Sequence, residues 1–511
     1  MEGGIKLKHM SNLIKNSSYV DLNSYDINMD VVKKISREMA NKLGVFPFDI
    51  KDNKVCVASS KTINEDIINY IKFIYQKDVR VYIVEPYKIK SYMDKYYENQ
   101  SFNKAVKELE MEKQTNYMST LSDKYKQNIK TAPAVKIVNF IINEAIKMNA
   151  SDIHIEPLKD IVLIRFRIDG ILIKFTEITK NIFEFICKRI KIISNMDISK
   201  IFIPGDGKIL YDLNNKKYDI RVSTLPTING EKIVLRILHK NCCNSSLNSL
   251  GYNNKNYETI KKCIKYSKGM ILVTGPTGCG KSTTLYAMLN ELDKQENNIT
   301  TIEDPVEYDM PYINQVNVNK KAGLTFATGL RSILRQDPDV IMLGEIRDRE
   351  TAEIAVKSAM TGHLVLSTLH TKDAVSSILR LMNMGVENYL IADTLVAVIA
   401  QRLVRKICPN CKKKYIPNDY EKKKINLCEG EFLYKGTGCD KCNNTGYSGR
   451  TVVCEVMVVD EKLKEFIRDM KDTKLLKKYI KDQGMISLID NGLELVRKGV
   501  TTYEEVLKSV N

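Results

Sequence analysis

The loop at residues 275–282, GPTGCGKS, restricts the possible folds of this chain more than any other feature of its sequence. It fills every fixed position of the pattern G-x-x-x-x-G-K-[ST], in which backbone N–H groups surround phosphate oxygens. The apolar letters MILV precede the loop and STTLYAMLNEL follows it, as expected for a buried strand and a helix. A strand, a phosphate loop and a helix in this order predict a parallel α/β sheet with the loop at its edge.

Two side chains of this loop have chemistry of their own. Lys281 is predicted to neutralise the β- and γ-phosphates of a nucleotide, and the Ser282 hydroxyl to ligate Mg²⁺. The chain is therefore expected to use ATP and Mg²⁺ as cofactors. The predicted nucleotide contacts are Gly275, Pro276, Thr277, Gly278, Cys279, Gly280, Lys281, Ser282 and Thr283.

Acidic residues and histidines follow the next apolar segments. ITTIEDPVEY carries Glu303 at the end of a predicted strand, and DPDVIMLGEIRD carries Glu345. Because ligands bind at the carboxyl ends of parallel strands, both carboxylates are expected beside the phosphate loop. A third segment, HLVLSTLH, is bracketed by His363 and His370. A histidine more often makes a structural hydrogen bond than acts in catalysis, so the residues alone leave their role open.

Length and composition limit the class of protein. At 511 residues the chain should form three or four domains, and 43% hydrophobic with 28% charged residues is typical of globular proteins. A net charge of +17 suits nucleic acid, an anionic membrane surface or phosphate ligands, without choosing among them. No apolar run reaches the ~18 residues of a membrane span, and the start lacks the apolar core of a secretory signal. We expect a cytoplasmic protein without a transmembrane segment.

Changes in pattern divide the chain into six predicted segments. They are a small α/β module (1–98), a polar linker (99–130), a second domain (131–240), the phosphate-loop domain (250–405), a cysteine-rich subdomain (406–455) and a helical tail (456–511).

Arginines gather on the predicted strands of the second domain. These strands have a period of two, so Arg165 and Arg167 share one face while their apolar neighbours share the other. Arg221 and Arg236 lie on later strands of the same kind. The pattern predicts an antiparallel sheet with arginines on its polar side.

Two C-x-x-C pairs lie in the subdomain at 406–455. Their cysteines are Cys408, Cys411, Cys439 and Cys442, and 27 residues separate the pairs. Four thiolates can close one tetrahedral Zn²⁺ site without an open position for catalysis, the alternative being free thiols in a reducing compartment. The remaining cysteines are expected to be core or surface residues. Cys279, inside the phosphate loop, adds the hypothesis that its oxidation blocks turnover.

Four blocks of the central domain stand together: GPTGCGKSTT, TIEDPVEY, LRQDPDVIMLGEIRD and AMTGHLVLSTLHT. With them the chain closely resembles the secretion ATPase superfamily, specifically its type II secretion and type IV pilus assembly branch, from residue 151 to the tail. The resemblance implies a RecA-like P-loop ATPase domain, preceded by an α+β PAS-like domain and a small N-terminal α/β module, with a zinc-stapled C-terminal insertion.

The resemblance also implies partners. Such proteins are cytoplasmic homohexamers at the inner face of the membrane, whose ATP hydrolysis moves an inner-membrane platform protein and so extends a pilus or pseudopilus. The N-terminal module would anchor the ring to a membrane-anchored docking protein, or simply stabilise the chain.

Roles for single residues follow from the same resemblance. Glu303 would orient the attacking water, Glu345 would support the Mg²⁺ side, and His363 and His370 would sense the γ-phosphate. The arginines that would approach the triphosphate are Arg165, Arg167, Arg221, Arg236, Arg331 and Arg335. The chain departs from the family in SKIFIPGDGK, where Lys208 replaces an expected arginine and loses its planar fork.

Three other functions remain open at this stage. A retraction motor would keep the chemistry, but the large N-terminal module and the four cysteines favour assembly. A nucleic-acid translocase would need stacking platforms or a basic groove, neither of which is evident, so no nucleic acid is expected. A scaffold that only binds ATP is disfavoured by Glu303 and Glu345. No tandem repeat is found in the first 130 residues, so a cyclic dinucleotide is not predicted either.

Overall fold

The computed structural model describes residues 27–85, 133–238, 246–427, 430–469 and 473–510, with a few positions between 18 and 25 and between 89 and 97. The predicted linker at 99–130 lies outside these residues. Among the helices described, none is both long and apolar enough to cross a membrane. Within these residues, the strands form four sheets of four, six, seven and two strands.

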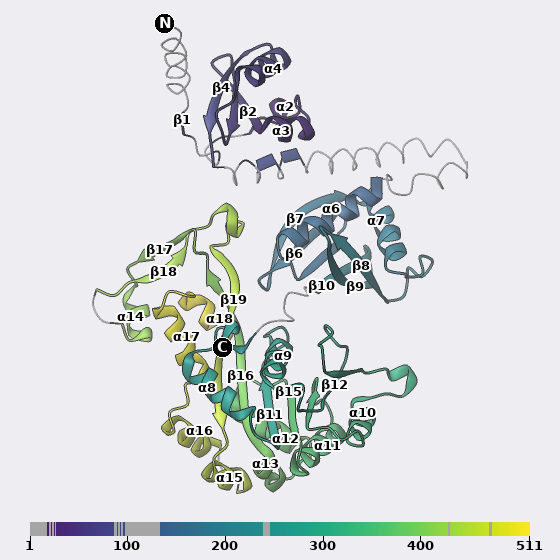
Figure 1. The fold of residues 1–511 in the computed structure, drawn as a ribbon, viewed down its shortest axis with the longest axis vertical. Coiled ribbons are helices and arrows are strands. Elements are labelled where there is room, and N and C mark those ends of the chain that lie inside the picture. The colour runs from purple at the N-terminus through teal and green to yellow at the C-terminus, as the bar shows by residue number, and fades with distance from the viewer. Residues whose placement is uncertain are drawn as a thin grey trace.

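The first sheet belongs to the N-terminal module and has the strand order β1-β4-β3-β2. The elements are β1 (Ser18–Tyr19), α2 (Met29–Val32), α3 (Arg37–Leu43), β2 (Val45–Lys51), β3 (Lys54–Ser59), α4 (Glu65–Tyr75) and β4 (Asp78–Ile83). Asn28, Ser36 and Asn64 begin the three helices, because each side chain accepts a hydrogen bond from a backbone N–H of the first turn. The module, whose ribbon is purple in Figure 1, has its own apolar core.

The second domain is an antiparallel sheet with the order β7-β6-β5-β10-β9-β8. Its elements are α6 (Pro133–Lys147), β5 (Asp152–Pro157), β6 (Ile161–Ile168), β7 (Ile171–Thr179), α7 (Lys180–Ile193), β8 (Gly205–Leu213), β9 (Lys216–Thr227) and β10 (Gly230–Leu238). Residues of α6 and α7 share one core with the sheet. On β6, Ile164 and Phe166 are buried while Arg165 and Arg167 are half-exposed, as their alternation predicts.

The phosphate-loop domain contains the seven-stranded sheet, with the order β13-β12-β14-β15-β11-β16-β19. Its strands are β11 (Gly269–Thr274), β12 (Ile299–Glu303), β13 (Asn314–Asn317), β14 (Val340–Leu343), β15 (Leu364–Leu369), β16 (Leu395–Ile407) and β19 (Tyr447–Val458). All pairs are parallel except β16 with β19. The carboxyl ends of β11, β12, β14 and β15 therefore lie along one edge of the sheet.

Helices cover both faces of this sheet (Figure 1). They are α8 (Asn254–Cys263), α9 (Lys281–Glu291), α10 (Phe326–Ile333), α11 (Arg349–Met360), α12 (Ala374–Asn383) and α13 (Asn388–Thr394). The core shared with α8 and α9 takes Ala397 and Ile399 from β16, whereas the core shared with α10 to α13 takes Val398 and Ala400. Successive residues of β16 thus point to opposite faces of the sheet.

The sheet extends beyond the limit of 405 expected for this domain. β16 continues to Ile407, and β19 pairs with it from Ala397↔Val458 to Ile407↔Tyr447. The cysteine-rich segment is thus inserted between two neighbouring strands of one sheet. It contains β17 (Lys412–Tyr415), α14 (Asp419–Ile425) and β18 (Leu433–Gly436).

The C-terminal region is helical, as its pattern predicts, with α15 (Glu461–Arg468), α16 (Thr473–Asp482), α17 (Leu488–Arg497) and α18 (Tyr503–Val510). Apolar residues of all four helices join the core on the α10 to α13 side of the large sheet. Arg405 of β16 forms an ion pair with Glu505 of α18, which fixes the last helix to the sheet.

Candidate active site

The phosphate loop connects β11 to α9 along a backbone path that requires glycine. Gly275, Gly278 and Gly280 have φ values of 150°, 78° and 88°, which side chains other than glycine rarely adopt. A Cβ atom on Gly275 would lie 2.5 Å from the Gln401 carbonyl oxygen, so glycine is also required by space. The Lys281 Nζ donates to the carbonyl oxygens of Gly275 and Pro276 at 3.0 and 3.1 Å. Burial lowers the pKa of this amine.

A buried glutamine of β16, which the sequence analysis missed, holds the loop from behind. The Gln401 Nε2 donates to the Cys279 carbonyl oxygen at 2.8 Å. Its Oε1 accepts from Tyr252 at 3.0 Å and from Thr284 at 2.9 Å, so the nitrogen and the oxygen of this fully buried amide both have hydrogen-bond partners. Cys279 itself is buried, and burial raises the pKa of its thiol, so the structure does not favour the reactive thiolate that the oxidation hypothesis requires.

Glu345 and His370 meet at the edge of the sheet that carries the phosphate loop. The Glu345 Oε2 lies 3.7 Å from the His370 Nε2, and its Oε1 accepts from Arg347 at 2.5 Å. Burial lowers the pKa of His370, with the positive charge of Lys281 acting in the same direction. These two predicted residues therefore lie within the electrostatic reach of the phosphate-binding lysine, as their positions after β14 and β15 predict.

Glu303 ends β12 but points into the protein. Its carboxylate is 5% exposed and accepts from Thr301 at 2.6 Å, from Gln315 at 3.3 Å and from the Tyr286 hydroxyl. Burial raises the pKa of Glu303, while these three donors oppose the shift. Tyr286 belongs to α9, so the carboxylate is joined to the helix that begins at the phosphate loop.

His363 lies at the wrong end of its strand for the role expected of it. It precedes β15, and its carbonyl oxygen accepts from the N–H of Gly269, the first residue of β11. The phosphate loop follows the other end of β11, and at about 3.3 Å per residue the seven positions from His363 to His370 span roughly 23 Å. The His363 Nδ1 is 2.9 Å from the Ser358 carbonyl oxygen. Within this chain, His370 therefore lies at the end of the sheet that carries the phosphate loop and His363 at the opposite end.

Three of the arginines that are expected to approach the nucleotide form ion pairs with carboxylates inside the second domain. The Arg165 Nε donates to Glu156 at 2.8 Å, and the Arg236 Nε donates to Asp152 at 2.9 Å. Arg167 lies 3.6 Å from the same Asp152. Both carboxylates are on β5, between the strands that carry these arginines, so within this chain the three guanidinium groups face their own sheet.

Arg221 alone of the four reaches the phosphate-loop domain. Its Nη2 lies 3.5 Å from the Val306 carbonyl oxygen and 3.9 Å from the Glu307 Oε2, in the segment that follows β12. The cross-strand partner of Arg221 is Lys208, whose Nζ pairs with Asp219 at 2.5 Å. The residue that departs from the family pattern thus stands beside Arg221, with its own charge compensated.

Arg331 and Arg335 are engaged on α10 and the turn after it. Arg331 forms an ion pair with Glu350 at 2.6 Å, and the Arg335 Nη1 donates to the Arg331 carbonyl oxygen at 3.0 Å. Arg331 therefore lies on α10 and Arg335 in the turn that follows it, and the partner of each is a group other than the phosphate loop. Their expected approach to the triphosphate stays a prediction.

The four predicted cysteine ligands come together in space. Their sulfur atoms all lie within 4.8 Å of one another, with Cys408 to Cys439 and Cys411 to Cys442 both at 3.8 Å. Four sulfurs around one Zn²⁺ at about 2.3 Å would be about 3.8 Å apart, so the cage has the right size. Burial opposes ionisation of Cys442, but backbone N–H donors of Cys439 and Gly446 lower its pKa to about 7. The donor set fits zinc.

A glycine-rich loop between a buried parallel strand and a helix, with a carboxylate and a histidine converging from neighbouring strand ends, defines a P-loop nucleoside triphosphatase. The chain belongs to the family described as type II/IV secretion system protein, which matches residues 127–508. An MshEN domain matches residues 16–102. The resemblance that the sequence indicates is thereby confirmed, as is an α/β secretion ATPase fold with a separate N-terminal domain.

Several characterised proteins are similar along most of the chain. The type II secretion system ATPase E of Vibrio cholerae is 46% identical over 379 residues, which cover 74% of this chain and 75% of that protein. The type IV pilus assembly ATPase PilB of Myxococcus xanthus is 39% identical over 498 residues, covering 96% of this chain and 88% of that protein.

Solved structures share the fold. The pilus retraction motor PilT with bound ADP aligns with a TM-score of 0.52 and 27% identity, over 73% of this chain and 96% of that one. The ATPase DotB of Legionella pneumophila aligns with a TM-score of 0.56 and 21% identity, over 72% of this chain and 94% of that one.

Proposed function

We propose that this chain is the ATP-hydrolysing motor that drives assembly of a type IV pilus or a type II secretion pseudopilus. The similarity to an assembly ATPase over 96% of the chain supports this function, because it includes the N-terminal domain. The convergence of Lys281, Glu345 and His370 at one edge of the sheet carries the proposal, since it supplies a phosphate-binding amine beside a carboxylate.

The site suggests a role for each group. Backbone N–H groups of the phosphate loop and Lys281 would bind the phosphates, and Ser282, exposed at the start of α9, would ligate Mg²⁺. Bound Mg²⁺ would neutralise charge on the β- and γ-phosphates. Glu345 would support the metal side through a water, and His370 would approach the γ-phosphate from the end of β15. Glu303, ionised and held by the Tyr286 hydroxyl, would orient the attacking water.

The nucleotide site would be completed either by arginines that move toward it or by a neighbouring chain that supplies them. Arg221 contacts the segment after β12, whereas Arg165, Arg167 and Arg236 have carboxylate partners within their own sheet. We infer that the chain works as a homohexamer at the cytoplasmic face of the inner membrane, in which a neighbouring domain supplies arginine to the nucleotide. The ring would act on an inner-membrane platform protein, with the N-terminal domain bound to a docking protein.

The cysteine cage is proposed to hold one structural Zn²⁺. All four sulfurs would be ligands, which leaves no position for a substrate, so the metal would stabilise the insertion between β16 and β19.

The proposal is tested by ATP hydrolysis measured against protein concentration, with size analysis in parallel, for the wild type and Arg221→Ala. Specific activity should rise steeply as rings form and fall in the variant while ATP still binds. Lys320→Ala, which removes a surface ion pair to Asp304 on the same side of the domain, is the matched control. Equal specific activity for a monomer and an unaffected Arg221→Ala would contradict the ring motor.

Retraction is the second candidate, since a retraction motor shares the fold at 27% identity. That match covers nearly all of the retraction motor but leaves about a quarter of this chain without a counterpart, which favours assembly. Stimulation of ATP hydrolysis by DNA, lost at high salt, would instead favour a nucleic-acid translocase.

A further inference from the structure

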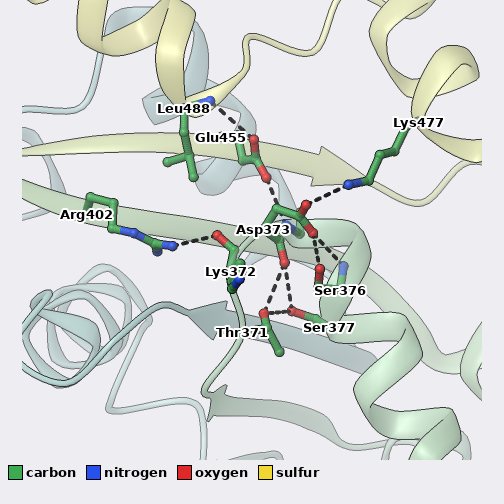
Figure 2. A network of polar contacts seen from close by, with 10 residues as sticks. Thr371, Lys372, Asp373, Ser376, Ser377, Arg402, Glu455, Lys477 and Leu488 are labelled. Carbon is green, nitrogen blue, oxygen red and sulfur yellow. Dashed lines mark hydrogen bonds and ion pairs between the residues drawn. The ribbon is translucent and has the colours of Figure 1, made fainter. Parts of the chain in front are cut away.

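Two consecutive residues of β16, Gln401 and Arg402, contact different parts of the nucleotide site from opposite faces of the sheet. Gln401 faces α9 and holds the phosphate loop through the Cys279 carbonyl oxygen. Arg402 faces α12, and its Nη2 donates to the Lys372 carbonyl oxygen at 2.6 Å. Figure 2 shows this guanidinium reaching the turn at residues 370–373, which we call the His370 turn.

The His370 turn connects the sheet edge to the C-terminal helices. Thr371 donates its N–H to the Thr274 Oγ1 at 3.0 Å, which fixes one side of the turn to the end of β11. On the other side, Asp373 caps α12 through the Ser376 N–H at 2.7 Å and pairs with Lys477 of α16 at 2.8 Å. His370 at the start of the turn faces Glu345.

Burial of the Arg402 guanidinium at this position lowers the stability of the fold. It is 8% exposed, and its guanidinium donates to two carbonyl oxygens, those of Gln401 at 2.9 Å and Lys372 at 2.6 Å. Within the described part of the chain, no carboxylate lies at ion-pair distance from it. A buried cation without a counter-ion costs stability, so an apolar side chain of similar volume would serve a merely structural role better.

We propose, as an extension of the ATPase function proposed above, that Arg402 is a positioning residue for hydrolysis and Gln401 a positioning residue for nucleotide binding. Arg402 keeps the His370 turn at a fixed distance from β16, and therefore keeps His370 in line with Glu345. Gln401 keeps the carbonyl of Cys279 turned away from the site, so that the loop presents its N–H groups to the phosphates.

The two roles separate in kinetics. The Arg402 Nη1 also lies beside the loop, 3.2 Å from the position of a Cβ atom on Gly275, but the hydrogen bond that anchors the loop comes from Gln401. Arg402→Met keeps that hydrogen bond, so ATP should bind nearly as before while the γ-phosphate side loses its alignment. Because misplacement by about 1 Å can cost roughly a hundredfold in rate, kcat of Arg402→Met should fall about ten- to a hundredfold with KM within about threefold. In Gln401→Leu the loop loses its buried donor, so KM and the Kd for a non-hydrolysable ATP analogue should rise about tenfold.

Conservative variants distinguish the loss of one contact from general unfolding. Arg402→Lys keeps one donor for the Lys372 carbonyl and should recover part of kcat. Gln401→Glu keeps the acceptor for Tyr252 and Thr284 but loses the donor to Cys279, so its KM should still rise. Arg405→Met, on the same strand with an ion pair to Glu505, is the matched control for general destabilisation.

Hydrogen exchange supplies a readout besides activity. In Arg402→Met the amide of Thr371, bonded to Thr274, should exchange faster while peptides of the phosphate loop keep their protection. If Arg402 had only a structural role, hydrogen exchange would become faster in both segments. In the control Arg405→Met, exchange should become faster near α18 instead.

The outcomes distinguish a failure of the proposed ATPase function from a failure of the roles assigned to Arg402 and Gln401. A wild-type chain without ATPase activity would contradict the proposed function itself. An active wild type in which Arg402→Met keeps its kcat, or raises KM as much as Gln401→Leu does, would overturn the division of roles between the two residues.

Discussion

The contact between Tyr286 and Glu303 predicts how hydrolysis depends on pH. The Glu303 carboxylate is almost fully buried, and burial raises its pKa while Thr301, Tyr286 and Gln315 oppose the shift. Tyr286→Phe removes one of these three donors without changing the volume of the side chain appreciably. If Glu303 must be ionised to orient water, the variant should need a higher pH to reach full activity.

The size of the shift follows from the hydrogen bond that is lost. A hydrogen bond to a charged group contributes about 1.5–3 kcal/mol, and about 1.4 kcal/mol corresponds to one pKa unit. The acidic limb of the kcat profile should therefore move up by about one to two pH units. The direction is fixed, because a carboxylate with fewer donors is harder to ionise.

Stability changes in the same sense. A carboxyl whose folded pKa lies above its unfolded value contributes stability at pH values below the unfolded pKa, and this contribution is lost as pH rises through the folded pKa. Removing the Tyr286 donor raises the folded pKa further, so the variant should lose more stability at high pH than at low pH. Thermal unfolding at several pH values measures this difference.

The assay is kcat for ATP hydrolysis between pH 5 and 9, with saturating ATP and Mg²⁺ at every point. Tyr211→Phe is the matched control, because Tyr211 also donates to a side-chain oxygen, that of Asn143 at 2.8 Å, but in the second domain. An acidic limb that stays in place in Tyr286→Phe would refute the reasoning, as would an equal shift in Tyr211→Phe.

Two further predictions concern the cysteines. Elemental analysis of the purified protein should find one zinc per chain. Cys411→Ser, or removal of the metal with a thiol reagent, should lower the melting temperature of the insertion. A protein without zinc whose melting curve is unchanged by the variant would contradict the site. Cys279 should be alkylated by iodoacetamide at pH 7 much more slowly than a free thiol, because burial raises its pKa, and Cys279→Ser should leave oxidant sensitivity unchanged. Labelling measured by mass spectrometry at the rate of an exposed cysteine would show that the phosphate loop opens.

Strongly periodic and motif-bearing segments could be predicted from the sequence. The phosphate loop, the strands that end near Glu303, Glu345 and His370, and the antiparallel strands with Arg165 and Arg167 all follow from local patterns. The two C-x-x-C pairs could also be predicted, because two cysteines with two residues between them can bind a metal when the fold brings a second such pair close. These are properties of residues close in sequence, whose backbone geometry is set by their neighbours.

Strand order and side-chain direction could not be predicted in this way. His363 and His370 bracket one strand, and only the parallel register of β15 with β11 shows that they lie at opposite ends of the sheet. Gln401 and Arg402 sit in an apolar strand without a motif, and their contacts arise from residues 30 to 149 positions away along the chain. Likewise β19 joins the sheet only because the antiparallel pairing with β16 crosses the whole cysteine-rich insertion.

The sequence by itself therefore determined the chemistry that this protein carries: a phosphate loop, acidic residues after apolar strands, arginines on a polar sheet face and four cysteines in two pairs. The tertiary structure decided which of these groups meet. It placed Glu345 and His370 beside Lys281, turned Glu303 toward Tyr286, and gave Arg165 and Arg236 partners of their own. The physical reason is that local patterns specify elements, whereas contacts between elements depend on how their buried faces pack together.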